Sequence, residues 1–279
     1  NGLFQSPITA KKVFEWREKL EKNELLVREI IDIDSTYIES EAEDESAILK
    51  GSKPKQKGAE NEKLDKTKKD PSDSKDEKES ADEKNQEYDP EDEFNPSLAA
   101  MEEEIKPKII STINILCKNY GKLIKLQNEK LNCALNAKEF TTSKGRGYKK
   151  IQEFIIEKIE TLQLNPSVLE NLVQLHYEEN KKIISLEGIL MRLAMECKIS
   201  RDEFLKYYVG NEINPNFESF LNENSTWRSF FKKKKKEISE IKERLIEFSK
   251  KIELPLYDFK QLVRKIQKGE KESRIAKKE

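Results

Sequence analysis

The chain has 279 residues, of which 38% are charged and only 35% are hydrophobic. This share of charge is well above that of an ordinary domain, and Lys, Glu and Leu at helical spacing, with few Val or Thr, argue against a β-rich fold. No apolar run approaches the ~20 residues that a helix needs to span a bilayer, so the composition excludes a membrane-embedded protein.

The net charge of −1 hides an uneven distribution. Residues 39–104 contain 23 Asp or Glu and 11 Lys, which gives a net charge of −12. The rest of the chain contains 42 basic and 31 acidic residues, which gives +11. An acidic segment is therefore set into a basic body.

The first predicted element covers residues 6–38 and is helical. Ser6 is placed to cap it and Pro7 to occupy its first position, and apolar residues then recur at helical spacing. A break is expected near Lys22-Asn23. The first residues lack the basic and apolar regions of a signal peptide. The chain opens on Asn1 rather than on an initiator methionine, so we expect it to begin inside a longer protein.

The segment 39–95 has a different composition, with almost no large apolar side chains. Such a sequence cannot bury enough apolar surface to offset its conformational entropy. We therefore predict that 39–95 is a disordered acidic linker.

Helical periodicity returns at Pro96. A long amphipathic helix is predicted to run to Leu135 and beyond, with a kink at Pro107, and to end in a turn at 141–147. A second helix follows around 151–162. The next helix is predicted to begin with Asn165 as its N-cap and Pro166 in its first position. A capping box formed by Ser167 and Glu170 is an alternative start for this helix.

The remaining helices are marked by their apolar stripes and caps. One stripe runs from Leu172 to Leu193, Ser200 caps the next helix, and Gly210 fits the position just past its end. A single register runs from Trp227 to Ile252. Leu254-Pro255 breaks it, and a helix over 257–268 follows, with Gly269 as a break before a new helix.

These elements predict an all-α fold, an antiparallel helical bundle interrupted by a long disordered acidic insertion. The predicted organisation is a first helical part (1–38), the acidic linker (39–95), the main bundle (96–268) and the start of a further helix (269–279).

Few residues in this chain are suited to catalysis or metal binding. His176 is the single histidine and lies on an apolar helix face, with Glu179 as a possible partner, so we interpret it as a core residue. Cys117, Cys133 and Cys197 are too widely spaced for a zinc site and suit a reducing cytoplasm. No phosphate-binding glycine loop occurs. We expect no metal, no cofactor, no small-molecule substrate and no enzymatic activity.

The most pronounced charge run is "FFKKKKKE" at 230–237, in which Lys234 falls on the apolar stripe. One interpretation is a solvated helix face with lysine stems lying along apolar surface. The other is contact with a phosphate backbone, which is independent of base sequence.

Three segments resemble a known family. "RKIQKGEKESRIAKKE" (264–279) resembles the sequence that leads into the second conserved region of primary sigma factors of the sigma-70 family. "MRLAMECKISRDEFLKYYVGNE" (191–212) is similar to that family's Cys-Lys segment, which ends in Gly-Asn-Glu. Residues 6–38 resemble the stretch after the first conserved region, so the chain resembles the non-conserved region between the two.

This resemblance implies a role in transcription initiation. Within a full-length sigma factor the region would support binding to the polymerase core through the β′ subunit, contact promoter DNA near the minus-ten element and assist promoter escape. The segments that recognise promoter sequence are absent from these 279 residues. The candidate contacts to DNA backbone or polymerase are Arg264, Lys265, Arg274, Lys277, Lys278, Lys232 and Lys233. The alternative is a stand-alone helical scaffold or adaptor with no role on DNA.

Overall fold

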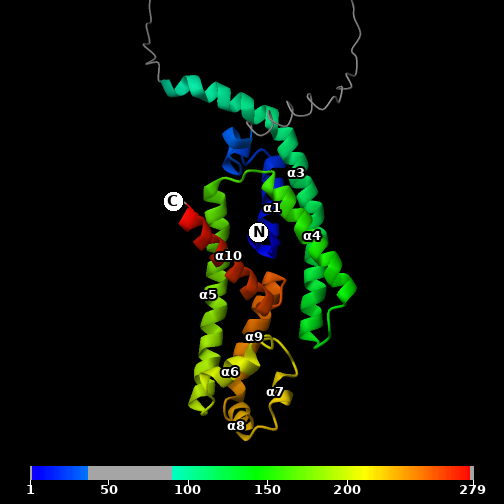
Figure 1. Cartoon of the computed structure of the whole chain (residues 1–279), viewed down its shortest axis with the longest axis vertical. Coiled ribbons are helices and arrows are strands. Elements are labelled where there is room, and N and C mark those ends of the chain that lie inside the picture. Colours follow the sequence, from blue (N-terminus) through cyan, green and yellow to red (C-terminus); the bar gives the residue numbers. More distant parts are fainter. Residues whose placement is uncertain (1, 37–89, 277–279) are drawn as a thin grey trace, which may run out of the picture.

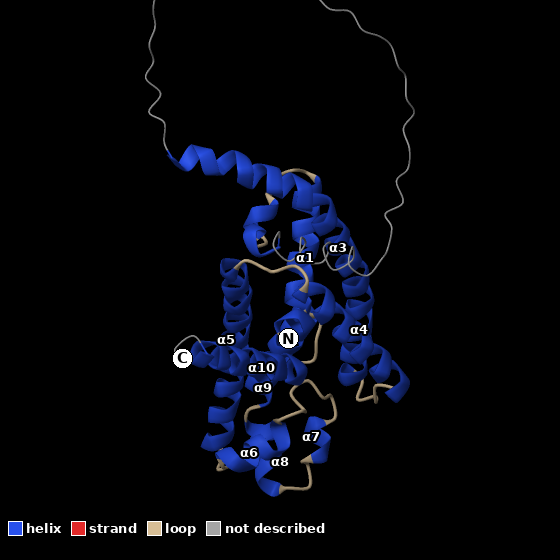
Figure 2. Cartoon of the chain, turned by 45° about the horizontal axis from the view of Figure 1, so that its top comes forward, coloured by secondary structure: helices blue, strands red, loops and turns tan. Residues whose placement is uncertain are grey.

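The computed structural model describes residues 2–36 and 90–276, with the side chains of 90–97 left aside. Within these ranges the chain is helical and contains no β-strand, apart from one isolated bridge between Ile31 and Leu164. Figures 1 and 2 show long helices that run side by side in alternating directions. The predicted all-α antiparallel bundle is therefore confirmed. Residues 37–89, which include most of the predicted linker 39–95, lie outside the described residues.

The elements follow one another in a simple order. Two short 3-10 helices, η1 and η2, flank α1, and seven further α-helices from α3 to α9 lead to the terminal α10. Their bounds are η1 Leu3–Gln5, α1 Pro7–Glu21, η2 Val27–Glu29, α3 Pro90–Leu135, α4 Thr142–Glu160, α5 Pro166–Glu196, α6 Arg201–Tyr208, α7 Phe217–Phe220, α8 Ser225–Lys233, α9 Lys235–Ile252 and α10 Leu256–Ala276.

The predicted helix starts are confirmed by their hydrogen bonds. The side chains of Ser6, Asn165 and Ser200 each accept a hydrogen bond from a backbone N–H in the first turn of α1, α5 and α6. Each cap satisfies a donor that the helix cannot pair internally. Gly210 has a φ of +88° just past the end of α6, where a side chain would be strained.

Three predicted boundaries are wrong. The long helix begins at Pro90 rather than at 96, and α4 begins at Thr142, so the predicted turn at 141–147 is mostly helical. The stripe from Trp227 to Ile252 is divided at Lys234, whose backbone is not helical, into α8 and α9. Tertiary packing overrides intrinsic propensity in α4, which buries Ile155 and Ile159 in the core that it shares with α3.

The break predicted at Gly269 is also wrong, because α10 continues through this position to Ala276. A glycine inside a helix costs only about 1 kcal/mol, which neighbouring contacts can offset. One such contact is the hydrogen bond that Tyr177 of α5 donates to Glu270, directly after the glycine. Pro107 lies inside α3, and Figure 1 shows this helix bent between its first turns and its longer second part, in line with the expected kink.

The bundle has two main hydrophobic cores. The first is built by α1, η2, the first part of α3 and α4, around residues such as Ile113 and Tyr120. The second is built by the later part of α5 and by α6 to α10, around Trp227 and Phe259. A smaller cluster of Leu3, Leu172 and Ile266 lies between elements of the two.

The N-terminal segment joins the two halves. Tyr120 donates a hydrogen bond to the carbonyl of Phe4, and Gln127 donates one to the carbonyl of Gln5, so α3 holds this segment in place. On its other side, a Cβ added to Gly2 would lie 2.9 Å from the Cβ of Lys265 in α10. The backbone at Gly2 therefore lies too close to α10 for any side chain at this position. This close approach packs α10 against the start of the chain.

Candidate functional site

The predicted contact residues fall into two groups that the fold does not bring together. Lys232 and Lys233 are exposed in the last turn of α8, at the end of the molecule formed by α6, α7 and α8 (Figure 1). Arg264, Lys265 and Arg274 are exposed on α10, which crosses α5 farther up (Figure 2). Lys277 and Lys278 lie outside the described residues.

The lysine run at 232–236 is not one continuous helical face. The interruption at Lys234 separates α8 from α9, and the Lys234 ammonium forms an ion pair with Glu196 of α5 at 2.8 Å. This contact raises the pKa of Lys234 through its hydrogen bond to Glu196. The neighbouring lysines are exposed, so the run combines one structural lysine with several solvated ones.

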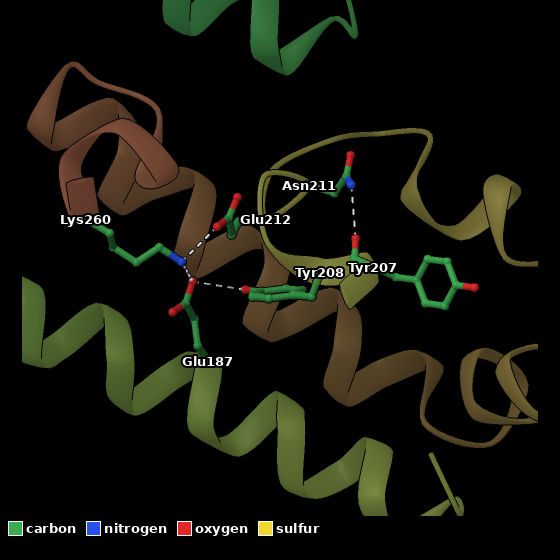
Figure 3. Close-up of polar contacts among 6 residues, drawn as sticks. All are labelled: Glu187, Tyr207, Tyr208, Asn211, Glu212 and Lys260. Atoms are coloured by element: carbon green, nitrogen blue, oxygen red, sulfur yellow. Dashed lines mark hydrogen bonds and ion pairs between the residues drawn. The ribbon is translucent and has the colours of Figure 1, made fainter. Parts of the chain in front are cut away.

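The most developed polar site is a buried ionic cluster between α5, α10 and the loop after α6 (Figure 3). The ammonium of Lys260 lies 2.7 Å from Oε1 of Glu187 and 2.8 Å from Oε1 of Glu212. The Glu212 side chain is 2% exposed, and those of Lys260 and Glu187 are 16% and 15% exposed. A single lysine thus bridges two carboxylates in the protein interior.

Tyr208 of α6 completes the ionic cluster. Its hydroxyl donates a hydrogen bond of 3.4 Å to Glu187, and the Lys260 ammonium lies 5.9 Å from the centre of its ring. The side chain of Asn211 donates to the carbonyl of Tyr207, which fixes the loop that carries Glu212 (Figure 3). Three separate elements are therefore held together at Lys260.

Burial sets the electrostatics of the cluster. It raises the pKa of Glu187; the positive charge of Lys260 opposes this shift, and the negative charge of Glu212 adds to it. Burial likewise raises the pKa of Tyr208 far above its ordinary value, so this phenol stays a hydrogen-bond donor. The cluster contains two carboxylates and one ammonium group. Lys260 is therefore the cation that compensates the buried charge of both carboxylates.

Sequence reasoning did not identify this cluster, although a signal for it exists. Lys260 lies four residues after Leu256 and three before Val263, and both of these are buried on α10. Glu187 has the same spacing between Ile183 and Leu190 on α5. A charged residue in the middle of an apolar helical stripe indicates a buried, paired charge.

His176 is a core residue, as predicted. It is fully buried, its Nδ1 lies 2.6 Å from the carbonyl oxygen of Leu172, and its ring stacks on Phe259 of α10. The suggested pairing with Glu179 is wrong, because Glu179 instead binds Lys182 at 2.9 Å and Lys251 of α9 at 3.0 Å. No protein group pairs with Nε2 of His176 in the described part of the chain, so protonation would leave a buried charge.

His176 should therefore make the protein sensitive to mild acid. Burial lowers its pKa, and the hydrogen bond to Leu172 only partly opposes this. Between this lowered value and the ordinary 6.5, the unfolded state binds more protons, so stability falls as pH falls through that window. We expect a slope of up to about 1.4 kcal/mol per pH unit, measured by urea unfolding from pH 7.5 to 5.

The matched variant for this measurement is His176→Leu, which removes the titrating group and keeps an apolar side chain. Glu187 titrates in both proteins, so its contribution cancels in the difference between them. Identical pH slopes for the two proteins would show that His176 does not carry the effect.

The three cysteines are all free thiols. Cys117 is buried, whereas Cys133 and Cys197 are half-buried. Burial raises the pKa of Cys117, which favours the unreactive thiol. Within residues 2–36 and 90–276, no three His, Cys, Asp or Glu side chains come together in a group that could hold a metal ion. None of the described helices combines the length and apolar character required to cross a bilayer.

A comparison with known protein families identifies the chain. Residues 6–248 match the family described as "Sigma-70, non-essential region". The chain belongs to this family. The resemblance drawn from 6–38 and 191–212 is thereby confirmed, and the chain is part of a sigma factor rather than a stand-alone adaptor. The family is not a class of enzymes.

The matched range contains three of the four members of the ionic cluster, but not Lys260. Two of its members, Tyr208 and Glu212, lie in the segment 191–212 that resembles sigma factors, and Glu187 precedes it within the matched range. Lys260 and the basic residues of α10 lie beyond residue 248. For 264–279 the resemblance to the entry of the second conserved region therefore stays a prediction.

Proposed function

We propose that this region acts as an accessory helical module of a primary sigma factor. It supports binding of sigma to the polymerase core, with the β′ subunit as the contact. It also adds affinity for promoter DNA near the minus-ten element and assists promoter escape. The proposal follows from membership of the sigma-70 non-essential region family, whose members act with polymerase on promoter DNA, in the bacterial cytoplasm.

The observation that carries the proposal is the way α10 is held. Its first half is buried through Leu256, Phe259 and Ile266, and Lys260 anchors it to α5 and to the loop after α6. Its second half is exposed from residue 267 to residue 276 except for Glu270. A helix that is fixed at its start can transmit the position of the bundle to residues 269–279 and to the second conserved region, into which these residues are predicted to lead.

The exposed basic residues on α10 and α8 are suited to contacts that do not depend on base sequence. Arginine and lysine bind phosphate oxygens, and each neutralised phosphate releases counterions and steepens the salt dependence of binding. The two groups lie apart, so we assign Arg264, Lys265 and Arg274 to the promoter side. Lys232 and Lys233, at the far end of the bundle, are assigned to polymerase.

Charge reversal in the complete sigma factor tests this assignment. We expect Arg264→Glu/Lys265→Glu to weaken holoenzyme binding to a promoter duplex and to lower the slope of log affinity against log salt by about 2, with core affinity unchanged. Lys232→Glu/Lys233→Glu should instead weaken binding to the core. The measurements are promoter binding at several salt concentrations, core binding, and the ratio of abortive to full-length transcripts.

The matched control is Lys149→Glu/Lys150→Glu, which makes the same change of charge at exposed positions of α4. A similar loss from all three pairs would mean that only net charge matters, and would contradict the assignment of contacts. Unchanged promoter binding, core binding and transcript ratio in both test variants would contradict the proposed function.

A further inference from the structure

An open groove between α5 and α9 has no role in the function proposed above. The volume of this groove is about 810 Å³. The two helices that form it, α5 and α9, lie side by side (Figure 1). Its lining consists of Lys181, Lys182, Ser185, Leu186, Arg244, Glu247, Phe248 and Lys251. Four of these eight side chains are cationic and one is acidic.

The cations of the groove fall into two pairs. Lys182 and Lys251 both bind Glu179, whose carboxylate is 18% exposed and lies between the two helices. Burial opposes ionisation of Glu179, but the hydrogen bonds from the two lysines outweigh it and hold its pKa below the ordinary value. Glu179 therefore fixes these two lysines at one end of the groove.

The second pair consists of Lys181 and Arg244, one on each side of the groove. Both are exposed, and neither has an acidic partner among the residues that the structure describes. Two unpaired cations facing a shared groove create a positive potential that attracts an anionic ligand. The groove thus presents free positive charge in addition to the pair held by Glu179.

The apolar part of the lining decides the kind of ligand. Leu186 and Phe248 are half-buried and pack against the second hydrophobic core, and their exposed parts line the groove together with the cations. A DNA duplex offers phosphates but no apolar side chain to cover such a surface. An acidic peptide with an apolar anchor offers both, as in other helix and strand recognition grooves.

We propose that the α5–α9 groove is a docking site for an acidic peptide segment of a partner protein, anchored by a large apolar side chain. The acidic side chains bind Lys181 and Arg244, and the anchor covers Leu186 and Phe248. The chain's own acidic stretch is a weaker candidate, because residues 50–87 contain Leu64 as their only large apolar residue. The inference is independent of the proposed function, since it requires neither polymerase nor DNA.

The test uses a fluorescein-labelled peptide of about 12 residues, rich in Glu and with two Leu four positions apart, whose binding to the full 279-residue chain is followed by anisotropy. We expect Lys181→Glu/Arg244→Glu to raise the Kd about tenfold or more. The control Lys149→Glu/Lys150→Glu should change it by less than about twofold. A peptide with Ser in place of both Leu should bind at least about fivefold more weakly.

Each other outcome overturns the proposal. An equal loss of peptide affinity in both protein variants would indicate general charge attraction. Equal affinity for the Ser peptide and the Leu peptide would show that the peptide does not contact Leu186 and Phe248. Displacement of the probe by duplex DNA, lost in Lys181→Glu/Arg244→Glu, would assign the groove to phosphate. The chain's own stretch is tested by amide replacements at the four acidic positions that flank Leu64, namely 60, 62, 65 and 70. Tighter probe binding by that variant would identify this segment as the occupant.

Discussion

Replacing Trp227 with Ala should lower the free energy of unfolding by about 3–5 kcal/mol, among the largest effects of any single substitution here. Trp227 is fully buried, and the rings of Phe204, Tyr207, Phe217, Phe230 and Phe231 lie with their centres 5.9–6.2 Å from its own. Its indole N–H donates a hydrogen bond of 2.8 Å to Glu203. The substitution removes the centre of this cluster and leaves a cavity among α6, α7 and α8.

The measurement is urea unfolding at pH 7 with two matched variants. Trp227→Phe keeps an aromatic ring and loses the hydrogen bond, so its cost should be clearly smaller than that of the alanine variant. Phe220→Ala removes a side chain that is 64% exposed and should change stability by no more than about 0.5 kcal/mol. A change near zero for Trp227→Ala would contradict a core role.

The sequence predicted the position of Trp227 well because its signal is local. Apolar residues at steps of three and four mark the buried face of a helix, and Ser6, Asn165 and Ser200 mark helix starts through hydrogen bonds within a few residues. For these features the fold adds little information. The all-α fold class follows from the same short-range patterns.

The wrong boundaries share a different cause, which is contact between segments far apart in sequence. Gly269 does not end α10, and Tyr177, which binds the following residue, lies on α5. Thr142 begins a helix early, where Lys144 meets Glu129 across the α3–α4 pair. Local propensity does not include such contacts, so it predicts a break at the glycines of both stretches.

The candidate site also combines features that local sequence predicts with features that depend on contacts between distant segments. The exposed lysines and arginines were visible in the sequence as charge runs, but nothing local showed that α8 and α10 present them at separate places. Lys260, Glu187 and Glu212 were missed as a site because their partners are 48 and 73 residues apart in sequence. A charge within an apolar stripe predicts burial, but the identity of its partner depends on the tertiary fold.

Replacing Lys260 with Met should also destabilise the protein by about 3–5 kcal/mol, because it breaks a buried ion pair by removing one side. Methionine fills a similar volume, so the loss comes from electrostatics rather than from a cavity. Glu187 and Glu212 would then be two buried carboxylates without their shared cation. Urea unfolding at pH 7 measures the loss, and a change below about 1 kcal/mol would show that the cluster is well solvated.

The pH dependence of this loss separates electrostatics from packing. Without Lys260, burial and the negative charge of Glu212 raise the pKa of Glu187 in the folded state further above its unfolded value. A raised pKa contributes stability at low pH that is lost as pH rises, so the deficit of Lys260→Met should shrink between pH 7 and pH 5. Adding Glu187→Gln should recover part of the stability at pH 7, because one buried charge is then removed. A deficit that is constant with pH, and unchanged in the double variant, would place the cost in packing and contradict the role of Lys260 as the cation that holds α10 to α5.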